Sequence, residues 1–146
     1  MMTYKLRPYT DTDFEFVYQA KKDAYKKYVE EYWGTWDEDK QRALFNDFIN
    51  KVQNTLSIIE HKGISIGLYH GNMMDQNTYE IGNIIVIPSY QGHGIGSDIL
   101  LSIFQQYPQL KMYLQVFKSN PAVNLYKRLS FTITDETRTH YMMERK

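Results

Sequence analysis

The chain has 146 residues, a length typical of one domain, and we expect residues 1–146 to form a single domain. Its 17 basic and 17 acidic residues cancel, which argues against a nucleic-acid partner, because such proteins need a basic face to neutralise phosphates. Cysteine is absent, which excludes thiolate metal sites, and no apolar run approaches the ~20 residues of a membrane helix, so we expect a cytoplasmic protein with no membrane partner.

The first third of the chain predicts one strand and two helices. Residues 3–9 are typical of a short strand that Pro8 ends. Thr10 is a suitable N-cap for a helix that continues to about residue 30. Thr35 and Glu38 have the spacing of a capping box, which predicts the start of a second helix ending near residue 53.

The rest of the chain alternates between the two-residue period of strands and the spacing of amphipathic helices. The expected elements are strands at 55–60, 63–70 and 78–87, a helix from 95 to about 107, a strand at 111–117, a helix from Pro121 to about Leu129, and strands at 131–134 and 139–144. This order predicts an α/β (α+β) fold in which a mixed central sheet is flanked by helices.

A glycine-dense loop, Gln91–Gly96, separates the most apolar strand from the following helix. Glycines allow close backbone approach, and a helix N-terminus offers unpaired N–H donors, so together they predict a phosphate or pyrophosphate site. The alternative is a plain turn. A Walker loop is absent, and the dinucleotide fingerprint GxGxxG fails because Ser97 stands at its last position when Gly92 is the first.

The loop has the form Q-x-x-G-x-G, with Gln91, Gly94 and Gly96, and a second stretch reads Asn-Pro-Ala-Val-Asn-Leu-Tyr-Lys-Arg-Leu-Ser-Phe over residues 120–131. With these two motifs in this order, the chain resembles the GNAT family of N-acetyltransferases. Ser130 departs from the family pattern, which usually has glycine before the phenylalanine. If this position is a left-handed helix cap, serine costs ~1 kcal/mol relative to glycine.

The resemblance implies acetyl-coenzyme A as cosubstrate and direct transfer of its acetyl group to a primary amine. It implies that the backbone near Val86 polarises the thioester oxygen and that Tyr126 protonates the leaving thiolate. The alternative for Tyr126 is a core aromatic residue. The cofactor-binding residues implied are Ile85, Val86, Gln91, Gly92, His93, Gly94, Ile95, Gly96, Ser97, Asn120 and Tyr126.

Glu80 is the candidate general base, because it lies on the thioester-binding strand at an offset before the loop similar to that of the catalytic glutamate of the histone-acetylating members. The alternatives are a solvated carboxylate on an exposed strand face, a water chain as the base, or the weaker candidates Asp75, His70 and His140. The four histidines show no metal-binding spacing, so we expect no metal site.

Members of the family acetylate small molecules or peptides, and the sequence does not decide which of these classes is the acceptor of this chain. Residues 25–42 combine aromatic and acidic side chains, which suits a cationic amine, although two amphipathic helices with solvated faces explain them equally well. The alternative functions are a non-catalytic acyl-coenzyme A sensor of the same fold and a regulatory domain that binds ATP or NAD. The aromatic strand at 139–143 makes a homodimer possible.

Overall fold

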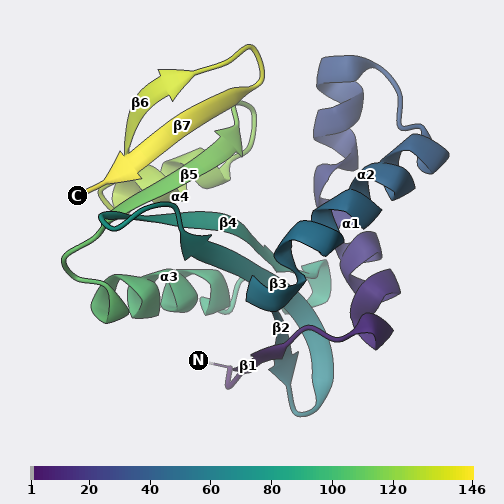
Figure 1. The fold of residues 1–146 in the computed structure, drawn as a ribbon, viewed down its shortest axis with the longest axis horizontal. Helices are drawn as coiled ribbons and strands as arrows, with labels where there is room; N and C mark the ends of the chain where they lie inside the picture. The colour runs from purple at the N-terminus through teal and green to yellow at the C-terminus, as the bar shows by residue number, and fades with distance from the viewer. Residues whose placement is uncertain (1) are drawn as a thin grey trace. The chain divides into compact units, whose positions relative to one another are not determined.

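Seven strands form one mixed sheet in a computed structural model that describes residues 2–146 (Figure 1). The strand order is β1-β2-β3-β4-β5-β7-β6. The pairs β1–β2, β2–β3, β5–β7 and β6–β7 are antiparallel, whereas β4 and β5 are parallel. The bounds are β1 Lys5–Pro8, β2 Leu56–His61, β3 Ile64–Met73, β4 Thr78–Val86, β5 Lys111–Phe117, β6 Thr132–Glu136 and β7 His140–Arg145.

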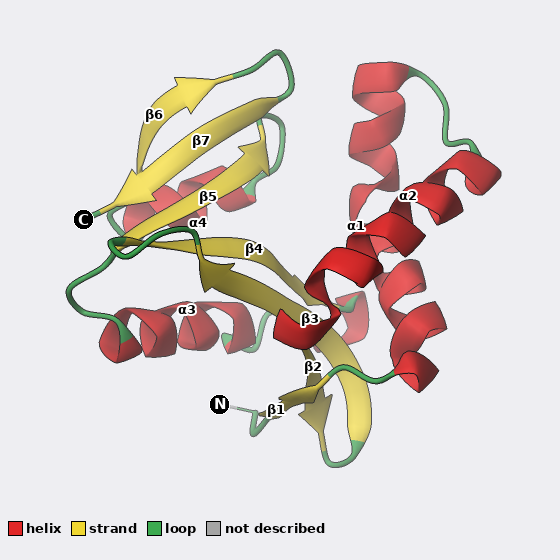
Figure 2. Ribbon diagram, in the orientation of Figure 1, coloured by secondary structure: helices red, strands yellow, loops and turns green. Residues whose placement is uncertain are grey.

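Four α-helices accompany the sheet in the described part of the chain (Figure 2). They are α1 Phe14–Trp33, α2 Glu38–Val52, α3 Ile95–Gln106 and α4 Ala122–Arg128, and short 3₁₀ turns precede α1, follow α2 and follow β4. A mixed sheet flanked by helices confirms the predicted fold class. The strand predicted at 63–70 is longer than expected, because β3 continues to Met73 and shortens the loop before β4.

The chain divides into two compact units, and the strands β3 and β4 each run from one into the other. The first unit contains the chain up to His70 together with Asn83–Gln106, and the second contains Gly71–Gly82 together with Tyr107–Lys146. The prediction of a single domain therefore stays a prediction.

The core of the first unit lies where α1 and α2 cover one face of the strands. Val17 of α1 and Phe45 of α2 pack in one buried cluster with Ile58, Leu68 and Ile85 of the strands. Each fully buried side chain of this size contributes ~1.5–3 kcal/mol by leaving water. Neighbouring strand residues face opposite sides, and the residue after Ile58 is also 0% exposed, so the second face of β2 is covered as well.

The second helix does not begin with the predicted capping box at Thr35. The cap is Asp37, whose Oδ1 accepts a hydrogen bond from the backbone N–H of Lys40 at 3.1 Å. Glu38 does not serve Thr35, because its carboxylate instead accepts hydrogen bonds from Tyr18 at 2.9 Å and Trp36 at 2.8 Å. The expected helix is present, but a tertiary contact with α1 decides its first residue.

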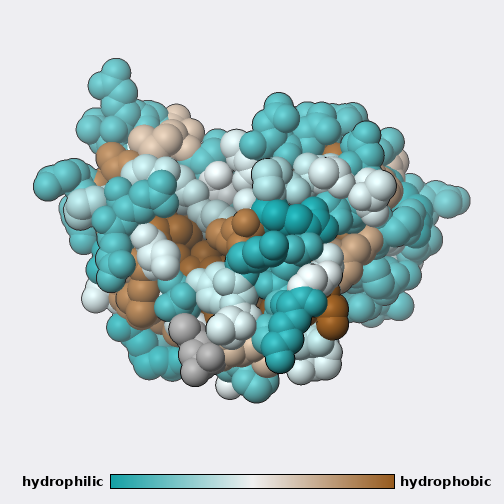
Figure 3. All heavy atoms as spheres, turned by 90° about the horizontal axis from the view of Figure 1, so that it is seen from below, coloured by the Kyte–Doolittle hydropathy of each residue, from teal (hydrophilic) through white to brown (hydrophobic). Residues whose placement is uncertain are grey.

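The surface is mainly polar, with hydrophobic residues gathered on part of the face drawn in Figure 3. Leu101 of α3 and Ile64 of β3 are among the exposed large hydrophobic residues. Within residues 2–146, no helix has both the length and the apolar character needed to cross a bilayer.

Candidate active site

The predicted glycine loop connects β4 to α3 in the first unit. After Val86 the chain makes a short 3₁₀ turn, and two glycines then adopt positive φ, 82° at Gly92 and 78° at Gly94. Residues other than glycine adopt this conformation only at a cost of ~1–2 kcal/mol. These two glycines turn the chain from the strand into the first turn of α3.

The N-terminus of α3 points its first backbone N–H groups out of the helix. The first helical hydrogen bond runs from the N–H of Asp98 to the carbonyl of Gly94 at 2.9 Å. The N–H groups of Ile95, Gly96 and Ser97 therefore precede the helical hydrogen bonds, and they carry the positive end of the helix dipole. This arrangement can bind an anion such as a pyrophosphate.

The side chain of Gln91 fastens the loop to the strand. Its Nε2 donates to the backbone carbonyl of Val86 at 2.7 Å, which holds the start of the loop against the end of β4. A Cβ added at Gly96 would meet only the side chain of Ile84, at 3.8 Å, so packing within the protein does not require glycine there. Contacts within the protein therefore do not explain the glycine at position 96, which fits a close approach of a ligand to the backbone there.

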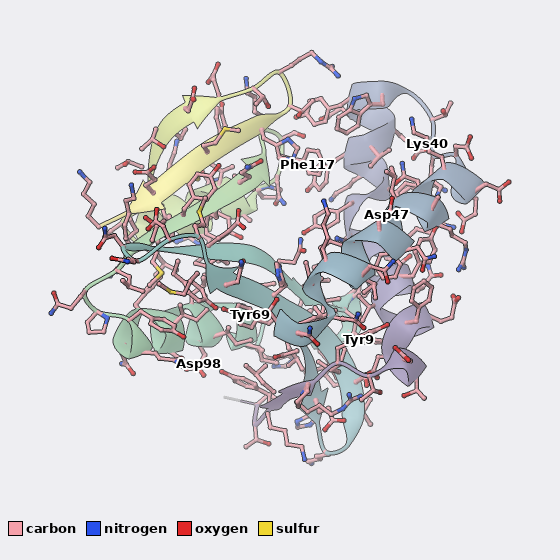
Figure 4. The ribbon with its side chains drawn as sticks, viewed as in Figure 1. Tyr9, Lys40, Asp47, Tyr69, Asp98 and Phe117 are labelled. Carbon is pink, nitrogen blue, oxygen red and sulfur yellow. The ribbon has the colours of Figure 1, made fainter. Side chains whose placement is uncertain are left out.

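The first carboxylate of α3 is already bound by the protein. Asp98, labelled in Figure 4, accepts a hydrogen bond from the hydroxyl of Tyr4 at 2.5 Å. Burial and this hydrogen bond raise the pKa of Tyr4. The contact fixes the segment before β1 on α3.

The second half of β4 has no pairing partner on β5. The parallel register joins Thr78–Ile81 to Lys111–Leu114 and ends there among the described residues, although β4 continues to Val86. On its other edge, the N–H of Ile87 donates to the carbonyl of Ile66 at 2.8 Å. A strand edge of this kind can pair with an extended ligand chain through backbone hydrogen bonds.

Position 67 of β3 requires glycine because of packing within the protein. A Cβ at this position would collide with the backbone carbonyl of Ile85, so only glycine lets β3 and β4 approach so closely here. The tract Gly63–Gly67 has the letters of the GxSxG nucleophile elbow, but it lies in the turn before β3 and in β3 itself, whereas the elbow needs a strand–turn–helix.

Tyr126 in the second unit is held by the end of α4. The N–H of Phe131 donates to the carbonyl of Tyr126 at 2.9 Å, and the N–H of Ser130 donates to that of Lys127 at 3.1 Å, which is a Schellman motif. The rings of Tyr126 and Phe131 meet edge to face with centroids 5.8 Å apart. The family-like stretch thus acts locally as a helix cap that orients the Tyr126 ring.

Asn120 and Glu80 also lie in the second unit. The Oδ1 of Asn120 accepts from the N–H of Ala122 at 2.9 Å, so its side chain binds a backbone donor in the first turn of α4. Glu80 is half-buried on β4, in register with Tyr113 of β5. The structure therefore brings Ile85, Val86 and Gln91–Ser97 together in the first unit, and places Glu80, Asn120 and Tyr126 in the second.

The weaker candidate bases have separate surroundings. His70 is buried, and burial followed by the charge of Lys21 lowers its pKa. Burial also lowers the pKa of His140, which shares a hydrogen bond of 2.7 Å with the hydroxyl of Thr139. Asp75 accepts from the N–H of Asn77 in the loop before β4. Residues 2–146 contain no cluster of histidine and carboxylate ligands suited to a metal ion.

The acidic side chain that faces α1 from residues 25–42 is neutralised within the protein. Glu38 forms an ion pair with Lys22 at 2.9 Å and a second, at 3.4 Å, with Arg42. The hydrogen bonds from Lys22, Trp36 and Tyr18 lower the pKa of Glu38 to about 2. This carboxylate is therefore occupied by the protein's own donors.

Lys21 is a further residue of interest that the sequence pattern did not single out. It lies half-buried on α1, and burial lowers its pKa to about 8. Lysine side chains on helices are usually exposed to solvent. The sequence indicates this burial only through spacing. Lys21 stands four residues after the buried Val17 and four before Tyr25, in the apolar stripe of the helix.

One family of known proteins matches the sequence of this chain. The model of the "Acetyltransferase (GNAT) family" matches residues 17–131. No curated protein matches the sequence.

Solved structures with the same fold share little sequence with this chain. The PaiA N-acetyltransferase from Thermoplasma acidophilum, in complex with coenzyme A, is 18% identical with a TM-score of 0.74, and 99% of each chain is covered. An acetyltransferase from Elizabethkingia anophelis with acetyl-CoA bound is 17% identical with a TM-score of 0.67, over 98% of this chain and 97% of that one. An Arabidopsis thaliana protein in complex with the bisubstrate analogue CoA-Ac-MVNAL is 17% identical with a TM-score of 0.64, over 99% of both.

Proposed function

The chain belongs to the acetyltransferase (GNAT) family, and we propose that it transfers the acetyl group of acetyl-coenzyme A directly to a primary amine of a small molecule or peptide. The observation that carries this proposal is the junction of β4 and α3. There a helix N-terminus, two glycines with positive φ and a strand edge without a β5 partner follow one another within about a dozen residues.

The junction suits acetyl-coenzyme A as the cosubstrate. Its pyrophosphate would be bound by the N–H groups of Gly92–Ser97, because the helix dipole and the unpaired donors favour an anion. Its pantetheine arm would pair with the backbone of Ile85 and Val86 as an added strand. The complexes of similar folds with coenzyme A and acetyl-CoA support this assignment.

The proposed reaction forms a C–N bond and breaks a C–S bond. The amine attacks the thioester carbonyl carbon, and the backbone N–H at Val86 stabilises the negative charge that develops on the carbonyl oxygen. Glu80 takes the proton that the amine must lose, and Tyr126 gives its hydroxyl proton to the leaving thiolate. A phenol has a pKa of ~10, close to that of a thiol leaving group, so the proton transfer from Tyr126 to the thiolate has a free energy near zero.

The cosubstrate is tested by calorimetric titration with acetyl-coenzyme A, with ATP and NAD as control ligands. We expect micromolar binding of acetyl-coenzyme A alone. Gly94→Val should abolish this binding, because a branched side chain blocks backbone approach at the loop.

Gly63→Val is the matched control. Gly63 has nearly the same φ, 79°, and lies in the turn between β2 and β3 with nothing within 4 Å of its added Cβ. It carries the same backbone strain away from the loop and should leave binding unchanged. Binding of acetyl-coenzyme A to Gly94→Val as tightly as to the unmodified protein would contradict the loop assignment.

A further inference from the structure

A lysine without an ion-pair partner lies among aromatic rings where α1 and α2 cover the sheet. The Nζ atom of Lys21 is 3.5 Å from the ring centroid of Phe48 and 5.9 Å from that of Tyr25. No carboxylate of residues 2–146 forms an ion pair with it, whereas the next lysine, Lys22, pairs with Glu38. Ring faces offset only part of the cost of removing an ammonium group from water, so this cation favours an anionic partner.

The imidazole of His70 belongs to the same cluster, because the charge of Lys21 acts on it and its ring packs on Phe48. His70 is 7% exposed, and no hydrogen-bond partner within the described residues reaches its Nδ1 atom. Its ring packs against that of Phe48 with centroids 6.0 Å apart. The lowered pKa keeps the ring neutral at pH 7, and an unpartnered nitrogen offers one hydrogen bond to a ligand.

A hydrogen bond connects these residues to the strand of the proposed acetyl transfer. Asn83 of β4 donates through Nδ2 to the hydroxyl of Tyr25 at 3.0 Å. Asn83 stands two residues before Ile85, a distance of ~6.6 Å along a strand. We call Lys21, Tyr25, Phe48, His70 and Asn83 the Lys21 cluster. All of its members except His70 keep partial exposure, so a ligand can reach them.

Neighbouring acidic residues do not compensate the charge of Lys21. Asp23, on the same helix, accepts a hydrogen bond from Gln19 at 2.8 Å. Asp47, labelled in Figure 4, immediately precedes Phe48 on α2 and is exposed. Glu38 is occupied by Lys22, Tyr18 and Trp36. The cluster therefore presents net positive charge beside the proposed acetyl-transfer strand.

We propose that the Lys21 cluster binds a carboxylate of the acceptor, so that the preferred acceptors are amines that carry a carboxylate, such as amino acids, rather than polyamines. The proposal rests on the acetyltransferase function above. The ammonium of Lys21 pairs with the carboxylate, the His70 nitrogen donates to it, and the rings of Phe48 and Tyr25 pack against the carbon chain. A wholly cationic acceptor is disfavoured, because its second charge is repelled by Lys21.

The test compares amino acids with their decarboxylation products as acceptors. Lysine with cadaverine and phenylalanine with phenethylamine are matched pairs that differ by one carboxylate. Thiol release from acetyl-coenzyme A gives kcat/KM for each. We expect the amino acid of each pair to be favoured about tenfold or more, since a charged hydrogen-bonded contact contributes that much discrimination. Equal values, or a preference for the decarboxylated amine, would overturn the proposal.

Two variants of neighbouring lysines separate the cluster from general surface charge. Lys21→Met keeps the length and apolar stem of the side chain and should remove the preference within each pair. Lys22→Met removes an equal charge from the same helix but outside the cluster, and should preserve the preference. A preference that survives Lys21→Met would count against the assignment.

A second readout does not depend on turnover. In protein labelled with ¹³C at the lysine side chains, the Lys21 signal should titrate with a pKa of about 8. Saturating N-acetylglycine, which supplies a carboxylate, should raise that pKa, because the charged form gains a partner. If no amine is acetylated, the proposed function fails while this titration still decides the carboxylate site; a Lys21 pKa that ignores N-acetylglycine refutes the site itself.

Discussion

The side chain of Tyr126 is oriented by the end of the short helix α4. The Schellman motif at the end of α4 fixes the backbone on both sides of its ring, and Phe131 packs against the ring edge. Tyr126→Phe keeps these contacts of the backbone and the ring edge, so the acid role is testable by removing one atom.

Tyr126→Phe should lower kcat by about a hundredfold or more, because general acids typically contribute 10²–10⁴ to a rate. The ring contact with Phe131 is kept, so acetyl-coenzyme A affinity and thermal stability should remain near those of the unmodified protein. Steady-state kinetics and calorimetry measure both. Tyr141→Phe is the control, because Tyr141 is also a half-buried tyrosine of the second unit, contacted by Lys118. An unchanged kcat in Tyr126→Phe would remove this residue as the acid.

Ser130 carries the backbone strain that the sequence predicts. Its φ is 74°, which confirms the left-handed cap expected from the family-like stretch. Ser130→Gly should raise the free energy of unfolding by about 0.5–1 kcal/mol, since glycine relieves the strain but loses more entropy on folding. Urea unfolding measures this change. A loss of stability would mean that the serine side chain stabilises the cap more than the strain costs.

Among the elements, the start of α1 depends on a partly buried ion-pair network that joins three segments. Arg7 of β1 donates to both oxygens of Asp13, at 2.7 and 2.8 Å, and its Nε donates to Glu60 of β2 at 2.6 Å. Asp13 is buried directly before α1 and also accepts from the N–H of Thr10 at 2.9 Å. This carboxylate therefore fixes where the helix leaves the first strand.

The hydrogen bond from Arg7 lowers the pKa of Asp13 in the folded protein. Its stabilising effect is therefore complete above the unfolded pKa of ~3.9 and is lost as the pH falls through the lower folded pKa. Asp13→Asn should cost ~2–3 kcal/mol at pH 7, and the difference from the unmodified protein should shrink below pH 4. Urea unfolding at pH 7 and pH 3 measures both values.

Asp11→Asn is the control for this pH dependence. Asp11 lies in the same 3₁₀ turn but is exposed, and no ion pair holds it within residues 2–146. Its replacement should change stability by less than ~0.5 kcal/mol at either pH. If the cost of Asp13→Asn were the same at pH 3 as at pH 7, the carboxylate charge would not be the source of its effect.

At the scale of the whole molecule, the sheet joins strands that are far apart in the sequence. Lys5 of β1 pairs with Glu60 of β2, and the last strand, β7, lies between β5 and β6. β4 and β5 are parallel neighbours, which requires a connection that crosses over, and α3 supplies it. The glycine loop lies at the start of this connection, so the topology of the sheet determines where the anion-binding helix begins.

The sequence by itself determined the features that depend on local chemistry. Helical spacing, Pro8 at the end of β1, the glycine loop between β4 and α3, and the left-handed Ser130 all follow from preferences of neighbouring residues. These features were predicted correctly. The family motifs lie in such segments, which is why they pointed to a fold that the structure confirms.

Only the tertiary structure decided which distant side chains meet. Asp37 caps α2 in place of Thr35 because the Glu38 carboxylate binds Tyr18 of α1, and the exposed Gln91 binds a strand carbonyl. Lys21 becomes a candidate site because Phe48, His70 and Asn83 come from other elements to surround it or its neighbour Tyr25. Burial and pairing of charges depend on contacts across elements, and local residue preferences carry no information about them.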